Sequence, residues 1–149
     1  MARRQKRQIK IAMKLLELVE MIEDIARDQP NVNQILRDDI YELNTLQDIK
    51  YSVFCSTQQQ HQEENGFVTY NFVLFYVDRL LDDRSNQTEI QSIGIALLSN
   101  ILHRLEDNDV EVGSHSYQVF HQRFNDECAG VYVTVGLTIP TEYTCGELY

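Results

Sequence analysis

The residues of this chain that could carry acid–base or metal chemistry are four histidines, three cysteines and scattered pairs of carboxylates. A histidine acts as a metal ligand or general base when a carboxylate, a cysteine or a second histidine completes the set at a defined spacing. The chain contains no H-E-x-x-H and no C-x-x-C, so no such set is predicted and no metal is expected. The histidines and cysteines are His61, His103, His115, His121, Cys55, Cys128 and Cys145.

Motifs for hydrolysis or nucleotide chemistry are also missing. The chain has no G-x-S-x-G, no phosphate-binding loop and no dinucleotide fingerprint. Asp48 and Lys50 have the spacing of half a nuclease motif, but no acidic residue on a paired strand completes it. We therefore expect a protein that is not an enzyme and binds no cofactor. A metal-dependent activity is the only enzymatic alternative that the residues leave open.

The strongest structural pattern is a strand followed by a helix. Residues 66–77 are dense in β-branched and aromatic residues, and both faces of this predicted strand are largely apolar. A strand with one wet face would alternate apolar and polar residues. One helix can cover one face, so we expect the other to meet a second sheet or a neighbouring subunit. The side chains assigned to this oligomer interface are Phe67, Tyr70, Phe72, Leu74 and Tyr76.

The helix that follows has apolar residues at helical spacing from Ile90 to Leu105. Thr88 and Gln91 fit a capping box at its start. Gly94 lies within the apolar stripe, where it costs roughly 1 kcal/mol of helix stability relative to Ala. We infer that the helix packs very close to the sheet at this glycine.

An N-terminal helix with a wide apolar face is predicted over residues 2–28. Its first fourteen residues contain several cations and no acid, although the helix dipole disfavours positive charge at this end. Two interpretations remain open: a solvated helix start, or a basic arm that binds an acidic protein surface or nucleic acid. The cations assigned to the arm are Arg3, Arg4, Lys6, Arg7 and Lys10.

A β-hairpin is predicted at Asn65-Gly66, because both residues tolerate positive φ. The strand before it, residues 49–62, becomes polar toward its end and would pair with residues 67–70. The hairpin would project from the body, either as a solvated tip or as an arm that contacts a neighbouring protein. The residues assigned to inter-subunit or inter-ring contact are Gln58, Gln59, Gln60, His61, Glu63 and Glu64.

Two further strands, residues 117–124 and 131–139, complete the pattern, and the second alternates cleanly between apolar and polar residues. Residues 32–46 are ambiguous and are predicted as a short helix leading into a loop. This order is typical of an α+β fold with an antiparallel sheet of about four strands, in two hairpins, on which the long N-terminal helix and the central helix pack. The predicted organisation is a basic helix in residues 1–30, a core domain in residues 31–140 and a tail in residues 141–149.

Composition limits the partners. The net charge of -10 and a pI of about 4.7 make the chain a poor general nucleic-acid binder, because binding to phosphates requires cations. The odd number of widely spaced cysteines indicates free thiols in a reducing compartment. The chain has no run of ~18 apolar residues, so no membrane span is predicted. Acids interrupt the N-terminal apolar pattern, so we expect no signal peptide.

Two stretches resemble known proteins. Residues 124–132, Phe-Asn-Asp-Glu-Cys-Ala-Gly-Val-Tyr, lead into a strand that ends at Ile139-Pro140. They are similar to a C-terminal hairpin in structural proteins of phages that infect Bacteroides-type hosts. Residues 40–44, Ile-Tyr-Glu-Leu-Asn, and residues 48–51 are similar to the segment before the first strand of the same proteins. With its order of elements, the chain resembles head–tail connector and tail-terminator proteins of tailed phages, such as the crAss-like phages.

This resemblance implies a structural virion protein that forms a homo-oligomeric ring of six or twelve copies in the neck. The ring would seal the DNA channel and join portal and head to the tail. The implied partners are portal, neck and tail proteins, with DNA passing through the lumen without sequence-specific binding, in the virion and earlier in the host cytoplasm. The alternative from a different class is a small cytoplasmic regulatory domain that binds a protein or ligand through one concave apolar pocket.

Overall fold

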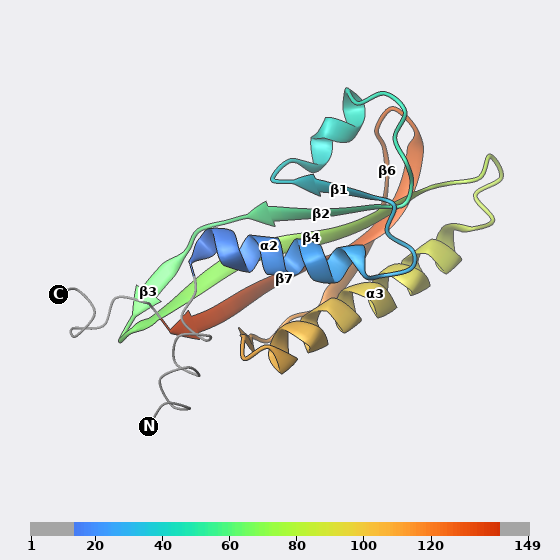
Figure 1. The fold of residues 1–149 in the computed structure, drawn as a ribbon. Coiled ribbons are helices and arrows are strands. Elements are labelled where there is room, and N and C mark those ends of the chain that lie inside the picture. The colour runs from blue at the N-terminus through green and yellow to red at the C-terminus, as the bar shows by residue number, and fades with distance from the viewer. Residues whose placement is uncertain (1–13, 141–149) are drawn as a thin grey trace.

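The computed structural model describes residues 14–140. They form an α+β fold in which two α-helices pack on one mixed sheet of seven strands (Figure 1). The helices are α2 (Leu15–Arg27) and α3 (Gln87–Asp107), and a 3₁₀ helix, η1, spans Ile40–Asn44. The strands are β1 (Gln34–Arg37), β2 (Val53–Gln58), β3 (Gln62–Glu64), β4 (Phe67–Arg79), β5 (Glu111–Val112), β6 (Tyr117–Arg123) and β7 (Glu127–Pro140).

β4 and β7 form the centre of the sheet. All thirteen residues of β4 pair with β7, from Phe67 opposite Pro140 to Arg79 opposite Cys128. The other edge of β4 pairs with β2 and then β3, and the other edge of β7 pairs with β6 and then β5. Among the described strands, β1 alone runs parallel to its neighbour, β2. β4 and β7 therefore link all parts of the sheet.

The predicted sheet of about four antiparallel strands is a partial match. The α+β class is confirmed, and so are the two hairpins, β3–β4 and β6–β7. The sheet, however, is mixed and has seven strands. The short helix predicted in residues 32–46 is wrong in its first part, because Gln34–Arg37 is a strand, β1, paired along β2. Pairing with β2 overrides the weak helical preference of these four residues.

Both helices cover the same face of the sheet (Figure 1). The alternation predicted for the last strand is confirmed, since its apolar side chains on this face are almost completely buried. Gly94 brings α3 close to the sheet, as expected. A methyl group on this residue would lie 2.8 Å from Val131 Cγ2 and 2.9 Å from Tyr76 Cδ2. The buried residues of β7 are Val131, Val133, Val135, Leu137 and Ile139.

The opposite face of the sheet is covered at one end. There η1 and Phe124 pack with Val53, Cys55 and Val77 in a second, smaller apolar cluster. Farther along β4 and β7, most side chains of the same face are exposed or half-buried, although Val73 is only 9% exposed and Phe75 and Phe120 border the smaller cluster. We call this region the open face. It comprises Thr69, Asn71, Phe75, Phe120, Tyr132, Thr134 and Thr138 and, at the end near the turn at Asn65-Gly66, Gln62, Glu64, Phe67 and Glu111.

The helix boundaries differ in part from those predicted. The start of the predicted helix 2–28 lies outside the described residues, and α2 ends at Arg27. The capping box at Thr88 is wrong, because α3 begins at Gln87. The Asn86 side chain accepts a hydrogen bond from the Leu81 amide and donates one to the Arg79 carbonyl, which fixes the turn before the helix.

Five residues of α2 belong to the same core as α3 and the sheet: Leu18, Val19, Ile22, Ile25 and Ala26. α2 is therefore packed as part of the fold formed by residues 31–140. The predicted tail, residues 141–149, lies outside the described residues. Within the described range, neither helix combines the length and apolar character needed to cross a bilayer.

Candidate assembly surface

The residues that could carry acid–base or metal chemistry belong to separate parts of the fold. His103 Nδ1 lies 2.9 Å from the carbonyl oxygen of Ser99, and His115 Nδ1 lies 2.8 Å from that of Gly113. Lys50 lies in the loop before β2, where its amide donates to the Gln34 side chain. Within residues 14–140, no three side chains of His, Cys, Asp or Glu are grouped to hold a metal ion. The described contacts of His103, His115 and Lys50 are therefore hydrogen bonds to nearby backbone or amide groups.

The hairpin at Asn65-Gly66 forms the end of an arm built from β3, the first residues of β4 and the last residues of β7 (Figure 1). Asn65 and Gly66 have φ angles of 51° and 82°, as the sequence predicts for a tight turn. Glu63 and Glu64 are exposed beside the turn. Gln58 pairs with Phe72, so it lies at the base of the arm. The contact residues predicted for the tip are thus spread along one edge of the arm.

A bulge separates β2 from β3. Gln58 pairs with Phe72 and Gln62 with Thr69, so three residues on one strand face two on the other. The Asn71 side chain donates to the Gln60 carbonyl at 2.7 Å, and the Gln59 amide donates to the Asn71 carbonyl at 2.8 Å. These hydrogen bonds replace part of the regular ladder between the strands and fix the conformation of the bulge.

His61 completes this bulge. Its Nδ1 accepts a hydrogen bond from the backbone amide of Asn71 at 3.2 Å, and its Nε2 lies 3.2 Å from Gln58 Oε1. An accepting Nδ1 carries no proton, so this geometry requires the neutral imidazole. The ring packs edge-on against Tyr70, with centroids 5.1 Å apart. Burial lowers the pKa of His61, in agreement with the neutral form. The neutral His61 side chain therefore stabilises the bulge that joins the base of the arm to its end.

The open face carries a group of three aromatic residues. The ring of Phe75 lies 5.7 Å from that of Tyr132 and 6.4 Å from that of Phe120, and the latter two are 6.1 Å apart. Gly130 makes room for Phe120, since a methyl group on it would lie 2.8 Å from Phe120 Cζ. All three rings are half-buried. Beside them, Thr134 is exposed.

At the arm, the open face contains a hollow of about 500 Å³. One row of paired residues crosses it, since Gln62 pairs with Thr69, Thr69 with Thr138 and Thr138 with Glu111. The hydroxyls of Thr69 and Thr138 lie 2.8 Å apart. Phe67 also lines the hollow and is 51% exposed. The charged residues of the lining are two glutamates, Glu64 and Glu111.

The residues assigned to an oligomer interface fall into two groups. Phe72, Leu74 and Tyr76 are at most 1% exposed and belong to the core under the helices. Phe67 is exposed and Tyr70 is half-buried. Sequence reasoning missed Phe75, Phe120 and Tyr132 as a group. The register of β4 and β6 against β7 would have revealed this group, because it brings the three residues from three different strands onto one face.

Charge on the described part of the chain is strongly one-sided. Each arginine from Arg27 to Arg123 makes an ion pair with a carboxylate. Many carboxylates remain in excess, because the net charge is -10 even though residues 1–13 carry five cations and no acid. The predicted basic arm, from Arg3 to Lys10, lies outside the described residues.

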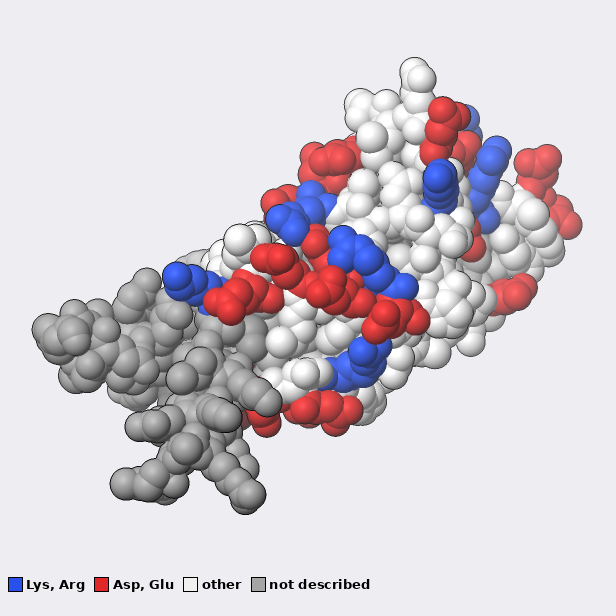
Figure 2. Space-filling model, in the orientation of Figure 1, with Lys and Arg blue, Asp and Glu red and all other residues white. Residues whose placement is uncertain are grey.

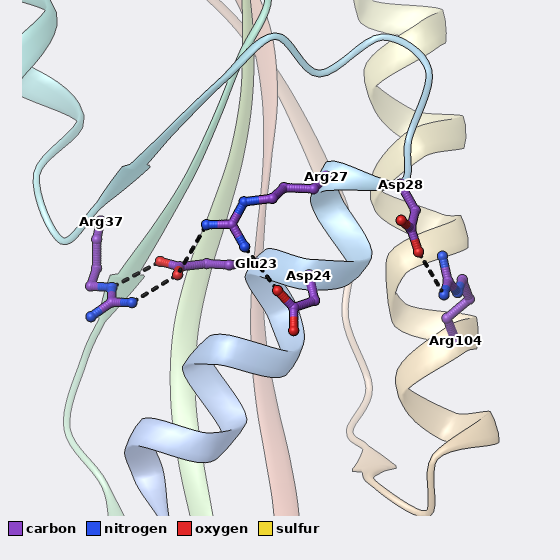
Figure 3. Close-up of polar contacts among 6 residues, drawn as sticks. All are labelled: Glu23, Asp24, Arg27, Asp28, Arg37 and Arg104. Atoms are coloured by element: carbon purple, nitrogen blue, oxygen red, sulfur yellow. Dashed lines mark hydrogen bonds and ion pairs between the residues drawn. The ribbon is translucent and has the colours of Figure 1, made fainter.

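The face covered by helices presents these ion pairs over α2 (Figure 2). Arg37 donates two hydrogen bonds to Glu23, at 2.8 Å and 2.7 Å (Figure 3). Arg27 pairs with Asp24, and Asp28, which follows the last residue of α2, pairs with Arg104 of α3. Positive and negative side chains therefore interleave on this face and are largely satisfied within the chain.

No protein-family model matches this chain, and the search of curated proteins finds no match.

Proposed function

We propose that this chain is a non-enzymatic structural protein of a virion, and that it forms a homo-oligomeric ring of six or twelve copies in the head–tail connector of a tailed phage. In this role, as a tail terminator or neck ring protein, it seals the DNA channel and joins the portal side to the tail. The proposal begins from the resemblance in residues 40–51 and 124–140.

The observation that supports the proposal best is the open face. A sheet face that carries three half-buried aromatic rings, with neutral polar residues beyond them, is suited to packing against another copy. β4 alone is about 43 Å long at the usual rise per strand residue, so the face offers an extended contact. Contacts between unlike surfaces of identical subunits close into a ring when the rotation is right.

Charge agrees with a channel through which DNA passes. The described body has an excess of carboxylates, and each of its described arginines is paired. An acidic lumen repels phosphates and lets DNA move without binding a particular sequence.

The experiment is the mass of the purified full chain by light scattering over a range of concentrations, alone and with a portal protein of the same virion. We expect a discrete species of six or twelve copies. Thr134→Arg places a charge on the open face at an exposed position and should reduce this species to monomer. Ser92→Arg, at an exposed position of α3, is the matched control and should leave the ring intact.

A protein that is monomeric at every concentration, with and without the portal, contradicts the proposal. In that case the small binding domain becomes the better description. A ring that survives Thr134→Arg but is lost with Ser92→Arg would place the contact on the helices instead of the open face.

A further inference from the structure

The open face at the arm is acidic at its rim and has no described partner for that charge. Glu64 and Glu111 are exposed, and neither makes an ion pair with another described residue. They flank Phe67, whose side chain is half exposed, and the neutral row of Gln62, Thr69 and Thr138. This surface therefore combines an uncovered apolar ring with two uncompensated negative charges.

The described body has few cations that could match it: six arginines, and two lysines, Lys14 just before α2 and Lys50 in the loop before β2. Its arginines are all paired, as set out above, and most of these pairs hold elements of the fold together. Most of the remaining positive charge of the chain is in residues 1–13, which have five cations, no acid, and the apolar residues Ile9 and Ile11 among them. Charge and apolar character are thus complementary between this segment and the hollow.

We propose that residues 1–13 of one copy dock on the open face of the arm of the next copy in the ring. This inference rests on the proposed function, since it needs a neighbouring copy. Thirteen residues reach up to about 43 Å when extended, which is about the length of β4. The segment precedes α2, which lies on the face of the sheet opposite to the hollow. A neighbour's open face is therefore a more direct target than the segment's own.

Docking of this kind makes the ring sensitive to salt. Ion pairs between exposed Lys or Arg and Glu are weak and are screened at high ionic strength. Ile9 and Ile11 beside Phe67 would add an apolar contact that salt does not screen. The segment then acts as a strap between subunits, separate from the aromatic contact near Phe75.

The test is zero-length carbodiimide crosslinking of the full chain, with equal amounts of unlabelled and ¹⁵N-labelled protein mixed before the ring is formed. Mass spectrometry identifies the joined peptides. We expect Lys6 or Lys10 joined to Glu64 or Glu111, with both isotopes present in one product. Products of a single isotope only would mean that the segment binds its own chain, and would overturn the inference.

A matched pair of variants checks the site. Glu64→Gln with Glu111→Gln should remove these crosslinks and weaken ring formation about fivefold at low salt, as expected for two exposed ion pairs. Glu106→Gln with Asp109→Asn makes the same change of charge at the end of α3 and should do neither. Equal loss in both variants would show a general charge effect and would also overturn the inference.

The two proposals fail in different ways. A monomer at all concentrations, with and without the portal, overturns the proposed function, and the docking with it. A ring that forms normally but has no crosslink from Lys6 or Lys10 to Glu64 or Glu111 overturns the docking alone.

Discussion

Arg37 on the edge strand β1 donates two hydrogen bonds to the carboxylate of Glu23 on α2 (Figure 3). The pair joins a strand and a helix that are in contact only in the folded protein. The Glu23 side chain is 7% exposed and that of Arg37 is 43% exposed. The hydrogen bond to Glu23 raises the pKa of Arg37. Because β1 has only four residues, this pair adds to the packing of Ile35 and Leu36 in holding the strand beside α2.

Glu23→Gln should destabilise the fold by about 1 kcal/mol, because it replaces a bidentate, charged acceptor with a neutral one at a buried position. Partial exposure of Arg37 keeps the loss below that of a fully buried pair. Urea unfolding followed by circular dichroism measures it. Asp24→Asn removes the exposed partner of Arg27 and is the control, with an expected change within about 0.5 kcal/mol. Equal effects of the two variants would contradict the role given to Glu23.

Gly94→Ala should destabilise the protein by about 1–2 kcal/mol, although alanine is the better helix former. The added methyl group meets Val131 and Tyr76 at less than 3 Å, so α3 must move away from the sheet. Thermal unfolding of the variant measures the loss. Ser92→Ala lies at an exposed position of the same helix and should be slightly stabilising. A gain in stability with Gly94→Ala would mean that the helix is not held close to the sheet.

The sequence reveals those elements whose apolar period is strong. β4, α3 and β7 are long enough for their patterns to be clear, and the turn at Asn65-Gly66 has a specific chemical signature. β1 and β5 have four and two residues. Their strand character comes from neighbours far away in the chain, which no local pattern encodes. The parallel pairing of β1 with β2 is invisible for the same reason.

The stability of the arm should depend on pH through His61. Its pKa is lowered from the ordinary value of 6.5, so the folded state binds fewer protons than the unfolded state near that pH. The contribution is complete above pH 6.5 and is lost as the pH falls through this value toward the lower pKa of the folded state. Urea unfolding between pH 8 and pH 5 should therefore show declining stability.

His61→Gln should flatten this part of the pH profile, because the variant has no proton to gain at this site. Exchange of the Asn71 amide, corrected for intrinsic rates, reports the same event locally, since this amide donates to His61. His121→Gln, on an exposed position of β6, is the control for loss of a histidine and should leave exchange of the Asn71 amide unchanged. An identical pH profile for wild type and His61→Gln would contradict the stabilising role of neutral His61.

Cys55 and Cys128 should be almost inert in the native protein. Both are fully buried, and burial raises the pKa of the Cys55 thiol to about 12 and that of Cys128 to about 11. Alkylation by iodoacetamide at pH 8 should be slower than in urea by on the order of 100-fold or more, because the thiolate is the reactive form. Peptide mass spectrometry reads each cysteine separately. Rapid alkylation of either one in the native protein would show that its cluster opens.

The candidate surface was harder to predict than the fold. The sequence indicates that β4 is apolar on both faces, but not which face the helices cover. Phe72, Leu74 and Tyr76 look like an interface for this reason and turn out to lie under α2 and α3. Phe120 and Tyr132 are separated from Phe75 by many residues, and only the register of β6 and β7 brings the three rings together.

The central position of β7 has a consequence for how the protein is made. β7 follows every other described element along the chain, yet it lies between β4 and the strands β5 and β6. During synthesis, one whole edge of β4 has no partner until β7 has been made. Pairing between strands so far apart in the chain also forms slowly. Tyr132 and Thr134 arrive with β7 itself. A polypeptide that ends before β7 therefore lacks Tyr132 and Thr134, and with them part of the surface proposed above for contact between copies.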